Sequence, residues 1–397
     1  MFDVLRRVTW VVSLAGAVAA CSPASLELPD GVRCASTVSA GPNENDVRDA
    51  LSRATSGSCV IAAAGKYALT YDVPAGVAFG GAPGTVVELS GSTSDTAAIR
   101  LGAGATLSGV VVRSAANVGV SIDSAGVKLQ SVTISGARVA GLVSWCEDDC
   151  RVADVTELRD VELTGNGVGL LAHGAHVKTF GGRIASSQSV SLASGYGVVA
   201  SHGATLEMTD TAVEDNEELG VLVDGRNGTS AALTNVGVRN NRGRGLWAQS
   251  LEGSLAAPKL QLTRCPIEGN ALVGLGARAS RGIQVNGGRV AATRVGLAAT
   301  ATPGVFADVG DGLGLFDTTG DVLVDGLALD NNERSQVLVD QGAAGVTVQN
   351  ATLTSQGAQL GVVVQRTSAS VQAPDIVRPM TGQELPISAP ALAVPTR

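Results

Sequence analysis

The chain has 397 residues, a formal net charge of -8 and 45% hydrophobic residues, but only 16% charged residues. This composition excludes wholesale disorder, because a chain this apolar can bury a core. The 51 glycines follow no Gly-X-Y period, which excludes collagen. The acidic balance argues against a nucleic-acid partner, since phosphate binding needs clustered lysine and arginine.

Residues 1–20 are predicted to be an export signal. Arg6 and Arg7 precede an apolar run that is too short to span a bilayer as a stable helix. The segment from Val18 to Cys21, Val-Ala-Ala-Cys, resembles the lipobox of bacterial lipoproteins, which implies cleavage before Cys21 and lipidation of its sulfur. An ordinary signal peptide is the alternative. We therefore expect a bacterial cell-envelope protein, anchored by lipid in the outer membrane and facing the periplasm or the surface.

The other five cysteines fit an oxidising compartment. We expect disulfides between Cys34 and Cys59 and between Cys146 and Cys150, although spacing alone does not fix the connectivity. A zinc site is the competing interpretation, but no histidine lies near these cysteines in the sequence. Cys265 is left over, and we expect it to be a buried, inert thiol.

The segment 45–54 is predicted to be an amphipathic helix within a lipidated linker and N-terminal cap that spans residues 21–57. Asn45 is its expected N-cap. One face of this helix carries Val47, Ala50, Leu51 and Ala54. We expect this face to cover the open end of the structure that follows, where unpaired strand edges would otherwise be exposed.

Residues 58–372 contain an internal repeat. A glycine followed by valine or leucine recurs at steps of mostly 22–29 residues, and a period of this length predicts a solenoid. The repeat glycines are Gly119, Gly141, Gly169, Gly197, Gly220, Gly245, Gly274, Gly314 and Gly361, and Gln336 fills the same slot. The one step of 40 residues is predicted to hide an irregular coil at Gly296-Leu297.

Each repeat is predicted to consist of strands. Two apolar residues separated by one residue precede an asparagine, as Val161 and Leu163 precede Asn166. This alternation predicts about three short parallel strands per coil, each bonded to its counterparts ~4.8 Å away. The asparagines of this slot are Asn166, Asn216, Asn241, Asn270 and Asn332. We expect them to have a structural role, with stacked amides that bond along the column.

Three features resemble the right-handed parallel β-helix superfamily, the pectin-lyase-like fold, over residues 58–372. The segment Gly65-Lys66-Tyr67, followed by Val73-Pro74-Ala75-Gly76-Val77, resembles the opening coil of such proteins. The asparagines resemble the asparagine ladder, and residues 45–54 resemble the capping helix. The resemblance implies an all-β, single-stranded right-handed parallel β-helix. The superfamily contains polysaccharide lyases, glycoside hydrolases and proteins without catalysis. The hydrolase and pectate-lyase motifs are absent, so the fold alone is weak evidence for an enzyme.

The fourth residue after each repeat glycine forms a mostly polar column. Its members are Asp123, Trp145, His173, Ser201, Asp224, Gln249, Arg278, Thr318 and Asp340, and His202 lies beside Ser201. We take five residues on one lateral face as candidate ligand-binding residues that point outward: Trp145, His173, His202, Asp224 and Arg278. A solvated turn column is the alternative. We assign no catalytic residue and expect neither a cofactor nor a metal, and we interpret the acidic run 214–218 as a solvated turn rather than a calcium site.

Residues 373–397 contain five of the thirteen prolines and are predicted to be an extended tail, either lying along the solenoid or disordered. The patterns together predict an exported, lipid-anchored scaffold that binds polysaccharide along one face without catalysis. A polysaccharide lyase or glycoside hydrolase is the alternative, and an adhesion stalk is a third class. The oligomeric state is left open.

Overall fold

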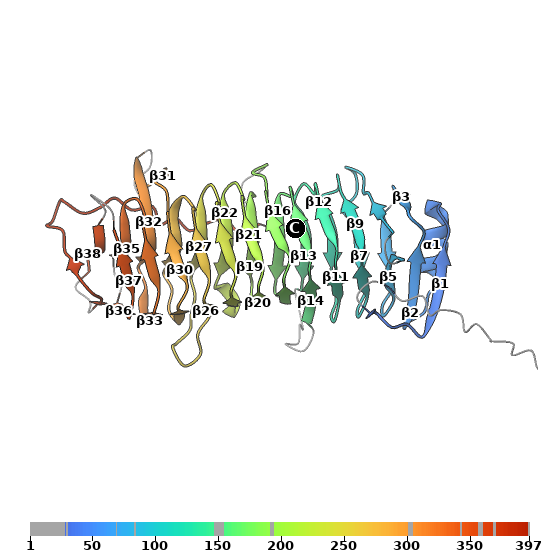
Figure 1. The fold of residues 1–397 in the computed structure, drawn as a ribbon, viewed down its shortest axis with the longest axis horizontal. Helices are drawn as coiled ribbons and strands as arrows, with labels where there is room; N and C mark the ends of the chain where they lie inside the picture. Colours follow the sequence, from blue (N-terminus) through green and yellow to red (C-terminus); the bar gives the residue numbers. More distant parts are fainter. Residues whose placement is uncertain are drawn as a thin grey trace, which may run out of the picture.

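Successive coils of the chain stack into a long solenoid of parallel strands, with one helix at the N-terminal end (Figure 1). The computed structural model describes residue 28 and residues 31–68, 70–82, 85–146, 155–190, 194–300, 305–341, 344–355, 360–367 and 371–395. The strands fall into three sheets that run the length of the solenoid, and each ordinary coil gives one strand to each sheet. The all-β fold class predicted from the repeat is confirmed.

The first sheet, sheet 1, has fourteen strands. They are β1 (Ser36–Ala40), β2 (Ser58–Ala62), β5 (Ala78–Gly81), β8 (Thr106–Ser108), β11 (Lys128–Gln130), β14 (Val155–Arg159), β17 (His176–Phe180), β20 (Thr205–Thr209), β23 (Ser230–Thr234), β26 (Leu260–Thr263), β29 (Ile283–Asn286), β33 (Thr319–Asp325), β36 (Ala344–Gln349) and β39 (Val371–Gln372).

The second sheet, sheet 2, has twelve short strands. They are β3 (Gly65–Tyr67), β6 (Val87–Leu89), β9 (Val110–Arg113), β12 (Thr133–Ser135), β15 (Glu162–Thr164), β18 (Arg183–Ala185), β21 (Ala212–Glu214), β24 (Gly237–Arg239), β27 (Pro266–Glu268), β30 (Arg289–Ala291), β34 (Ala328–Asp330) and β37 (Thr352–Thr354).

The third sheet, sheet 3, contains the repeat glycines. Its strands are β4 (Tyr71–Val73), β7 (Ala97–Leu101), β10 (Val118–Ile122), β13 (Ala140–Trp145), β16 (Val168–His173), β19 (Tyr196–Ser201), β22 (Leu219–Asp224), β25 (Arg244–Gln249), β28 (Leu272–Arg278), β32 (Phe306–Phe316), β35 (Ser335–Asp340), β38 (Leu360–Gln365) and β40 (Ile376–Val377).

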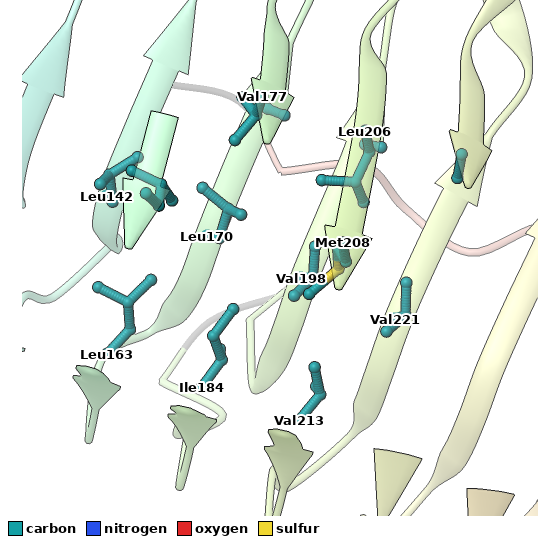
Figure 2. Close-up of a cluster of buried hydrophobic side chains, with 14 of the residues drawn as sticks. Leu142, Leu163, Leu170, Val177, Ile184, Val198, Leu206, Met208, Val213 and Val221 are labelled. Atoms are coloured by element: carbon teal, nitrogen blue, oxygen red, sulfur yellow. The ribbon is translucent and has the colours of Figure 1, made fainter. Parts of the chain in front are cut away.

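The interior of the solenoid is filled by aliphatic side chains from all three sheets. Figure 2 shows Leu170 and Val198 of sheet 3 facing Ile184 of sheet 2 and Leu206 of sheet 1. These four side chains are at most 2% exposed. Burial of one such side chain contributes ~1.5–3 kcal/mol against its exposure to water. The interior is therefore the main source of stability, and the sites must lie on the outer faces.

The asparagines form a ladder inside the turn between sheet 2 and sheet 3, as predicted. All five are at most 1% exposed. The side-chain amide of Asn216 donates to Oδ1 of Asn241 (2.9 Å), and that of Asn241 donates to Oδ1 of Asn270 (2.8 Å). Each of these two acceptor oxygens also takes a backbone N–H from the coil before it, so the ladder satisfies buried backbone groups that would otherwise lack a partner.

The predicted N-terminal helix is present as α1 (Glu44–Arg53), with a shifted start. The N-cap is Asn43 rather than Asn45, because the Asp46 carboxylate accepts the backbone N–H of Asn43 and completes a capping box. The predicted apolar face is confirmed, with Val47, Ala50 and Leu51 buried. The helix packs against β1, β2 and β4 at the end of the solenoid.

The prediction of an irregular coil at Gly296-Leu297 is wrong. These residues belong to β31 (Gly296–Ala299), which pairs antiparallel with the start of β32 and projects from the solenoid (Figure 1). The register also pairs Leu275 with Leu313, so the repeat glycine of this coil is Gly312 and not Gly314. The long step in the repeat is therefore a hairpin insertion within one coil.

Cysteine pairing is confirmed at one of the two predicted positions. Cys34 and Cys59 form a disulfide with a Cα–Cα distance of 5.5 Å, which ties the N-terminal segment to β2. Cys146 is disulfide-bonded, whereas Cys150 lies outside the described residues. Cys265 is a free, buried cysteine as predicted, and burial raises the pKa of its thiol.

The predicted export signal, residues 1–20, and the predicted lipidation site Cys21 lie outside the described residues. Among the residues that the structure describes, no helix is both long and apolar enough to cross a membrane.

Candidate functional site

The predicted column after the repeat glycines exists on the outer face of sheet 3. Register pairs join Trp145 with His173, His173 with Ser201, Asp224 with Gln249, and Gln249 with Arg278. In the next coil Arg278 pairs with Phe316, because the repeat glycine there is Gly312. The assignment of Thr318 to this column is therefore wrong.

Trp145, His173 and His202 come together as one stack of rings along the solenoid axis. The ring centroids of Trp145 and His173 are 3.6 Å apart and almost parallel, and those of His173 and His202 are 4.1 Å apart. A sugar ring packs on the face of an aromatic ring, but in this stack the faces cover one another. The arrangement therefore stabilises neighbouring coils and leaves mainly ring edges to a ligand.

Asp224 differs from the expectation that it points into solvent, because it is only 1% exposed. Nε of Arg226 lies 2.6 Å from one carboxylate oxygen, and the Gln249 amide lies 3.4 Å from the other. A buried carboxylate needs such partners, so Asp224 holds local structure and is closed to a ligand.

Arg278 lies in a pocket of about 340 Å³. The other lining residues are Thr300, Phe316, Asp317, Gln341, Ile387, Ala389 and Pro390. Within the described part of the chain, no hydrogen bond or ion pair links the Arg278 guanidinium to another side chain. Of the five predicted site residues, Arg278 is the one whose charge is still available to a ligand.

The outer face of sheet 3 is apolar along its centre. Val143, Leu171, Val199 and Leu222 point outward here, yet each is 0% exposed. Towards the C-terminal end, Trp247 takes the position of the aliphatic residues. The Phe316 ring, from the neighbouring polar column, lies 6.0 Å from the Trp247 ring between centroids.

Glycines make room for these two rings. A Cβ atom at Gly276 would collide with the Trp247 indole, and one at Gly314 would collide with the Phe316 ring. The apolar row packs against apolar residues of the C-terminal tail: Leu385, Ile387, Ala389, Leu392 and Val394. Most of the predicted site therefore lies beside a surface that the chain itself occupies.

The outer face of sheet 2 carries alternating charges that neutralise one another. Arg183 lies 2.6 Å from Glu214, and Arg289 lies 2.9 Å from Glu268 and 2.6 Å from Asp330. Such exposed pairs contribute little to stability. Because each charge already has a partner across the strands, this face offers little to a charged ligand.

The residues of the acidic run 214–218 point in different directions and have different partners. Glu214 pairs with Arg183, while Asn216 points inward as part of the ladder. Glu217 accepts the backbone N–H of Ser189 at 2.7 Å and lies 3.4 Å from Arg242. Among the described residues, no group of three or more His, Cys, Asp or Glu side chains could hold a metal ion.

The outer face of sheet 1 presents an open, polar row that the sequence analysis missed. One outward position of each coil is joined by register pairs from β14 to β29. This sheet 1 row consists of Arg159, Phe180, Thr209, Thr234, Thr263 and Asn286. All six side chains are partly or fully exposed. The period-two alternation of β17 and β20 was the signal that could have revealed this row.

A charged cluster lies beside the N-terminal end of the sheet 1 row. Nε2 of His176 lies 2.8 Å from Oε1 of Glu207, and Nζ of Lys178 lies 3.0 Å from Oε2. One coil earlier, Arg159 pairs with Glu157 and also lies over the Phe180 ring, 4.6 Å from its centroid. The side chain of His176 is only 10% exposed.

The electrostatics of this cluster favour an ionised carboxylate. Burial raises the pKa of Glu207, but the hydrogen bonds from Lys178 and His176 outweigh this effect and lower the pKa below its ordinary value. A general acid for glycoside cleavage needs a carboxyl group whose pKa is raised, so that it carries a proton near neutral pH. Glu207 is therefore suited to binding and poorly suited to proton donation.

Comparisons with known proteins identify the fold. No protein-family model and no curated protein sequence matches the chain. Among solved structures, the Dettilon tailspike protein aligns at a TM-score of 0.51 and 13% identity, over 79% of this chain and 64% of the tailspike chain, which is less than two thirds of it.

Two enzymes also align over most of the chain. For pectate lyase Pel9A the TM-score is 0.47 at 12% identity, over 82% of this chain and 80% of the other. For the catalytic domain of a GH87 α-1,3-glucanase it is 0.49 at 12% identity, over 89% and 69%. At 12–13% identity these likenesses concern the fold alone. The chain has the right-handed parallel β-helix fold.

Proposed function

We propose that this protein is an exported, envelope-anchored β-helix that binds a polysaccharide strand along the outer face of sheet 1 without cleaving it. The observation that carries the proposal is the open sheet 1 row, with one outward side chain per coil from β14 to β29. Coils repeat every ~4.8 Å, which is comparable with the length of one sugar unit in an extended glycan.

The chemistry of the row suits a sugar chain. Thr209, Thr234 and Thr263 each present a hydroxyl that can donate and accept a hydrogen bond, and Asn286 adds an amide. At the other end, the row contains the aromatic ring of Phe180, and the Arg159 guanidinium lies over this ring. From β23 to β29 no charged side chain occurs in the row, which favours a neutral glycan there.

The non-catalytic part of the proposal depends on the carboxylates beside the row. Glu157 and Glu207 each pair with cationic side chains, and the pKa of Glu207 is lowered. With its pKa lowered, Glu207 does not supply the protonated acid that glycoside hydrolysis needs. The second candidate is a lyase or hydrolase that uses the Arg278 pocket. The Arg278 guanidinium has no side-chain partner among the described residues, so it could hold a carboxylate of an acidic sugar.

A panel of neutral and acidic polysaccharides tests both ideas. The triple variant Thr209→Val/Thr234→Val/Thr263→Val removes three hydroxyls and keeps β-branched side chains. We expect it to bind the preferred glycan at least about tenfold more weakly, since each hydrogen bond contributes ~0.5–1.5 kcal/mol. The matched control Thr133→Val/Thr164→Val/Thr354→Val changes outward threonines of sheet 2 and should bind normally. Equal binding by both variants, or shortening of the glycan, contradicts the proposal.

The anchor is proposed on the sequence alone. With the lipobox intact, the mature protein should fractionate with membranes and start at an acylated Cys21, and Cys21→Ser should release it. Intact mass spectrometry of the membrane fraction decides the matter. An unmodified N-terminus at another residue would refute the anchor.

A further inference from the structure

The C-terminal segment 383–395 crosses the outer face of sheet 3 as an extended chain outside the strand ladders. It first contacts Gln365 of β38 and ends its polar contacts at Gln249 of β25, so it runs back over the coils. In Figure 1 the red trace turns back at the far end of the solenoid. The segment therefore lies on the sheet much as a bound peptide would.

The apolar contacts of the segment follow a period of two over its first half. Leu385, Ile387 and Ala389 face the sheet and are partly buried, whereas Pro386 and Pro390 are exposed. Beneath them lie outward residues of sheet 3, including Trp247, Phe316 and Leu338. Alternate side chains that fill a sheet surface are the usual source of specificity for an extended peptide.

Two glutamines of the sheet 3 column form hydrogen bonds with the backbone of the segment. The Gln365 amide donates to the carbonyl of Leu385 and accepts its N–H, both at 2.8 Å. Gln249 makes the same pair of bonds with Leu392, at 3.0 and 2.8 Å. Each glutamine side chain thus makes the two backbone hydrogen bonds that a neighbouring strand would make. Because these bonds involve only the backbone of the bound residue, they do not depend on its side chain.

Two arginines also form hydrogen bonds with the segment. The Arg244 guanidinium donates to the carbonyl and the hydroxyl of Ser388, at 3.3 and 3.0 Å, and lies 4.8 Å from the centre of the Trp247 ring. Arg334, paired with the buried Asp311, donates to the carbonyl of Pro386 at 2.6 Å. Burial lowers the pKa of Arg244 to about 10, so it stays charged at neutral pH and depends on these partners.

We propose that the outer face of sheet 3, from β25 to β38, is a peptide-binding groove, and that residues 383–395 are its resident ligand, displaceable by another extended polypeptide with apolar side chains at alternate positions. The groove holds backbone groups through Gln249 and Gln365, and side chains through a continuous apolar row. The tether raises the effective concentration of the resident segment to the order of millimolar, so a partner must compete with it. This proposal does not rest on the glycan site of sheet 1.

The test uses the full chain with a specific protease site inserted after Gly382. This exposed turn has open space around it, and Gly382 has a φ of +88°. After cleavage, we expect the C-terminal fragment to co-elute with the body in size-exclusion chromatography. A fluorescent peptide of residues 383–397 should then exchange into the groove of the cleaved protein and bind far more weakly to the uncleaved chain.

Variants distinguish specific binding of the C-terminal segment from nonspecific apolar association. Gln249→Ala/Gln365→Ala should speed release of the fragment at least tenfold, whereas the control Gln261→Ala/Gln349→Ala, in exposed residues of sheet 1, should not. If the first variant fails to fold, peptides carrying Leu385→Asp and Leu392→Asp replace it, and they should not compete. A fragment that separates at once from a folded body, a fragment that never exchanges, or displacement by a polysaccharide instead of a peptide would overturn the proposal.

Discussion

Sheets 1 and 3 wind around the same interior with the same coil spacing, yet their outer faces are opposites. Strand β20 of sheet 1 alternates, so Leu206 and Met208 are buried while Thr205, Glu207 and Thr209 reach solvent. Strand β22 of sheet 3 is buried at all six positions. The coil therefore fixes where side chains point, and the types of the outward residues decide whether a face stays exposed or must be covered.

The largest expected effect is on the unfolding free energy, when one aromatic residue from each face is replaced by alanine. Trp247→Ala removes a side chain that is 0% exposed beneath the tail, and it should cost ~3–5 kcal/mol of unfolding free energy. Phe180→Ala on the open face should cost about 1 kcal/mol or less, near the usual range for surface positions. Urea unfolding midpoints measure both. Similar losses would show that the two faces do not differ in burial as described.

A second prediction concerns the ladder inside the coils, which serves both faces. Asn241→Ala leaves the Asn216 amide and the backbone N–H of Asn216 without their acceptor. Each buried unsatisfied group costs ~1–3 kcal/mol, so we expect a loss of about 2–3 kcal/mol. Asn286→Ala, in the exposed sheet 1 row, is the matched control and should be nearly neutral. A neutral Asn241→Ala variant would contradict the structural role of the ladder.

The smallest expected effect is a pH dependence on the open face. The folded-state pKa of Glu207 is lowered, so its contribution to stability is present above its unfolded pKa of ~4.3 and is lost as pH falls through the folded pKa. Because the carboxylate is 41% exposed, solvent screening keeps this contribution below ~1 kcal/mol. The gap between wild type and Glu207→Gln should exist at pH 7 and close at acidic pH. A difference in stability between the two proteins that grows at acidic pH would contradict a lowered pKa of Glu207.

The coil architecture could be predicted because each coil repeats the same local signals. Glycine before an aliphatic residue, apolar alternation and the asparagine slot are all readable within one repeat. The start of α1 was misplaced by two residues because Asn43 and Asn45 are both plausible caps, and only the bond to Asp46 distinguishes them. The misassigned Gly314 has a similar origin, since Gly312-Leu313 and Gly314-Leu315 both match the repeat phrase.

The candidate site was harder to predict, because it depends on contacts between residues of different coils. The column was found, but the burial of Asp224 was not, because it depends on side-chain contacts with Arg226, two residues further along the chain, and with Gln249 of the next coil. The path of the tail was left open because its contacts with Gln249 join residues 143 positions apart. The sheet 1 row was missed because the repeat was aligned on the glycines of sheet 3 alone.

The most direct test of the central claim is isothermal titration of the preferred polysaccharide into three proteins. These are the wild type, the sheet 1 variant Thr209→Val/Thr234→Val/Thr263→Val, and the sheet 3 variant Arg278→Ala. We expect the sheet 1 variant to lose at least tenfold in affinity, whereas Arg278→Ala should bind as the wild type does. Loss of binding in Arg278→Ala with full binding by the sheet 1 variant would contradict this expectation and place the glycan on the outer face of sheet 3.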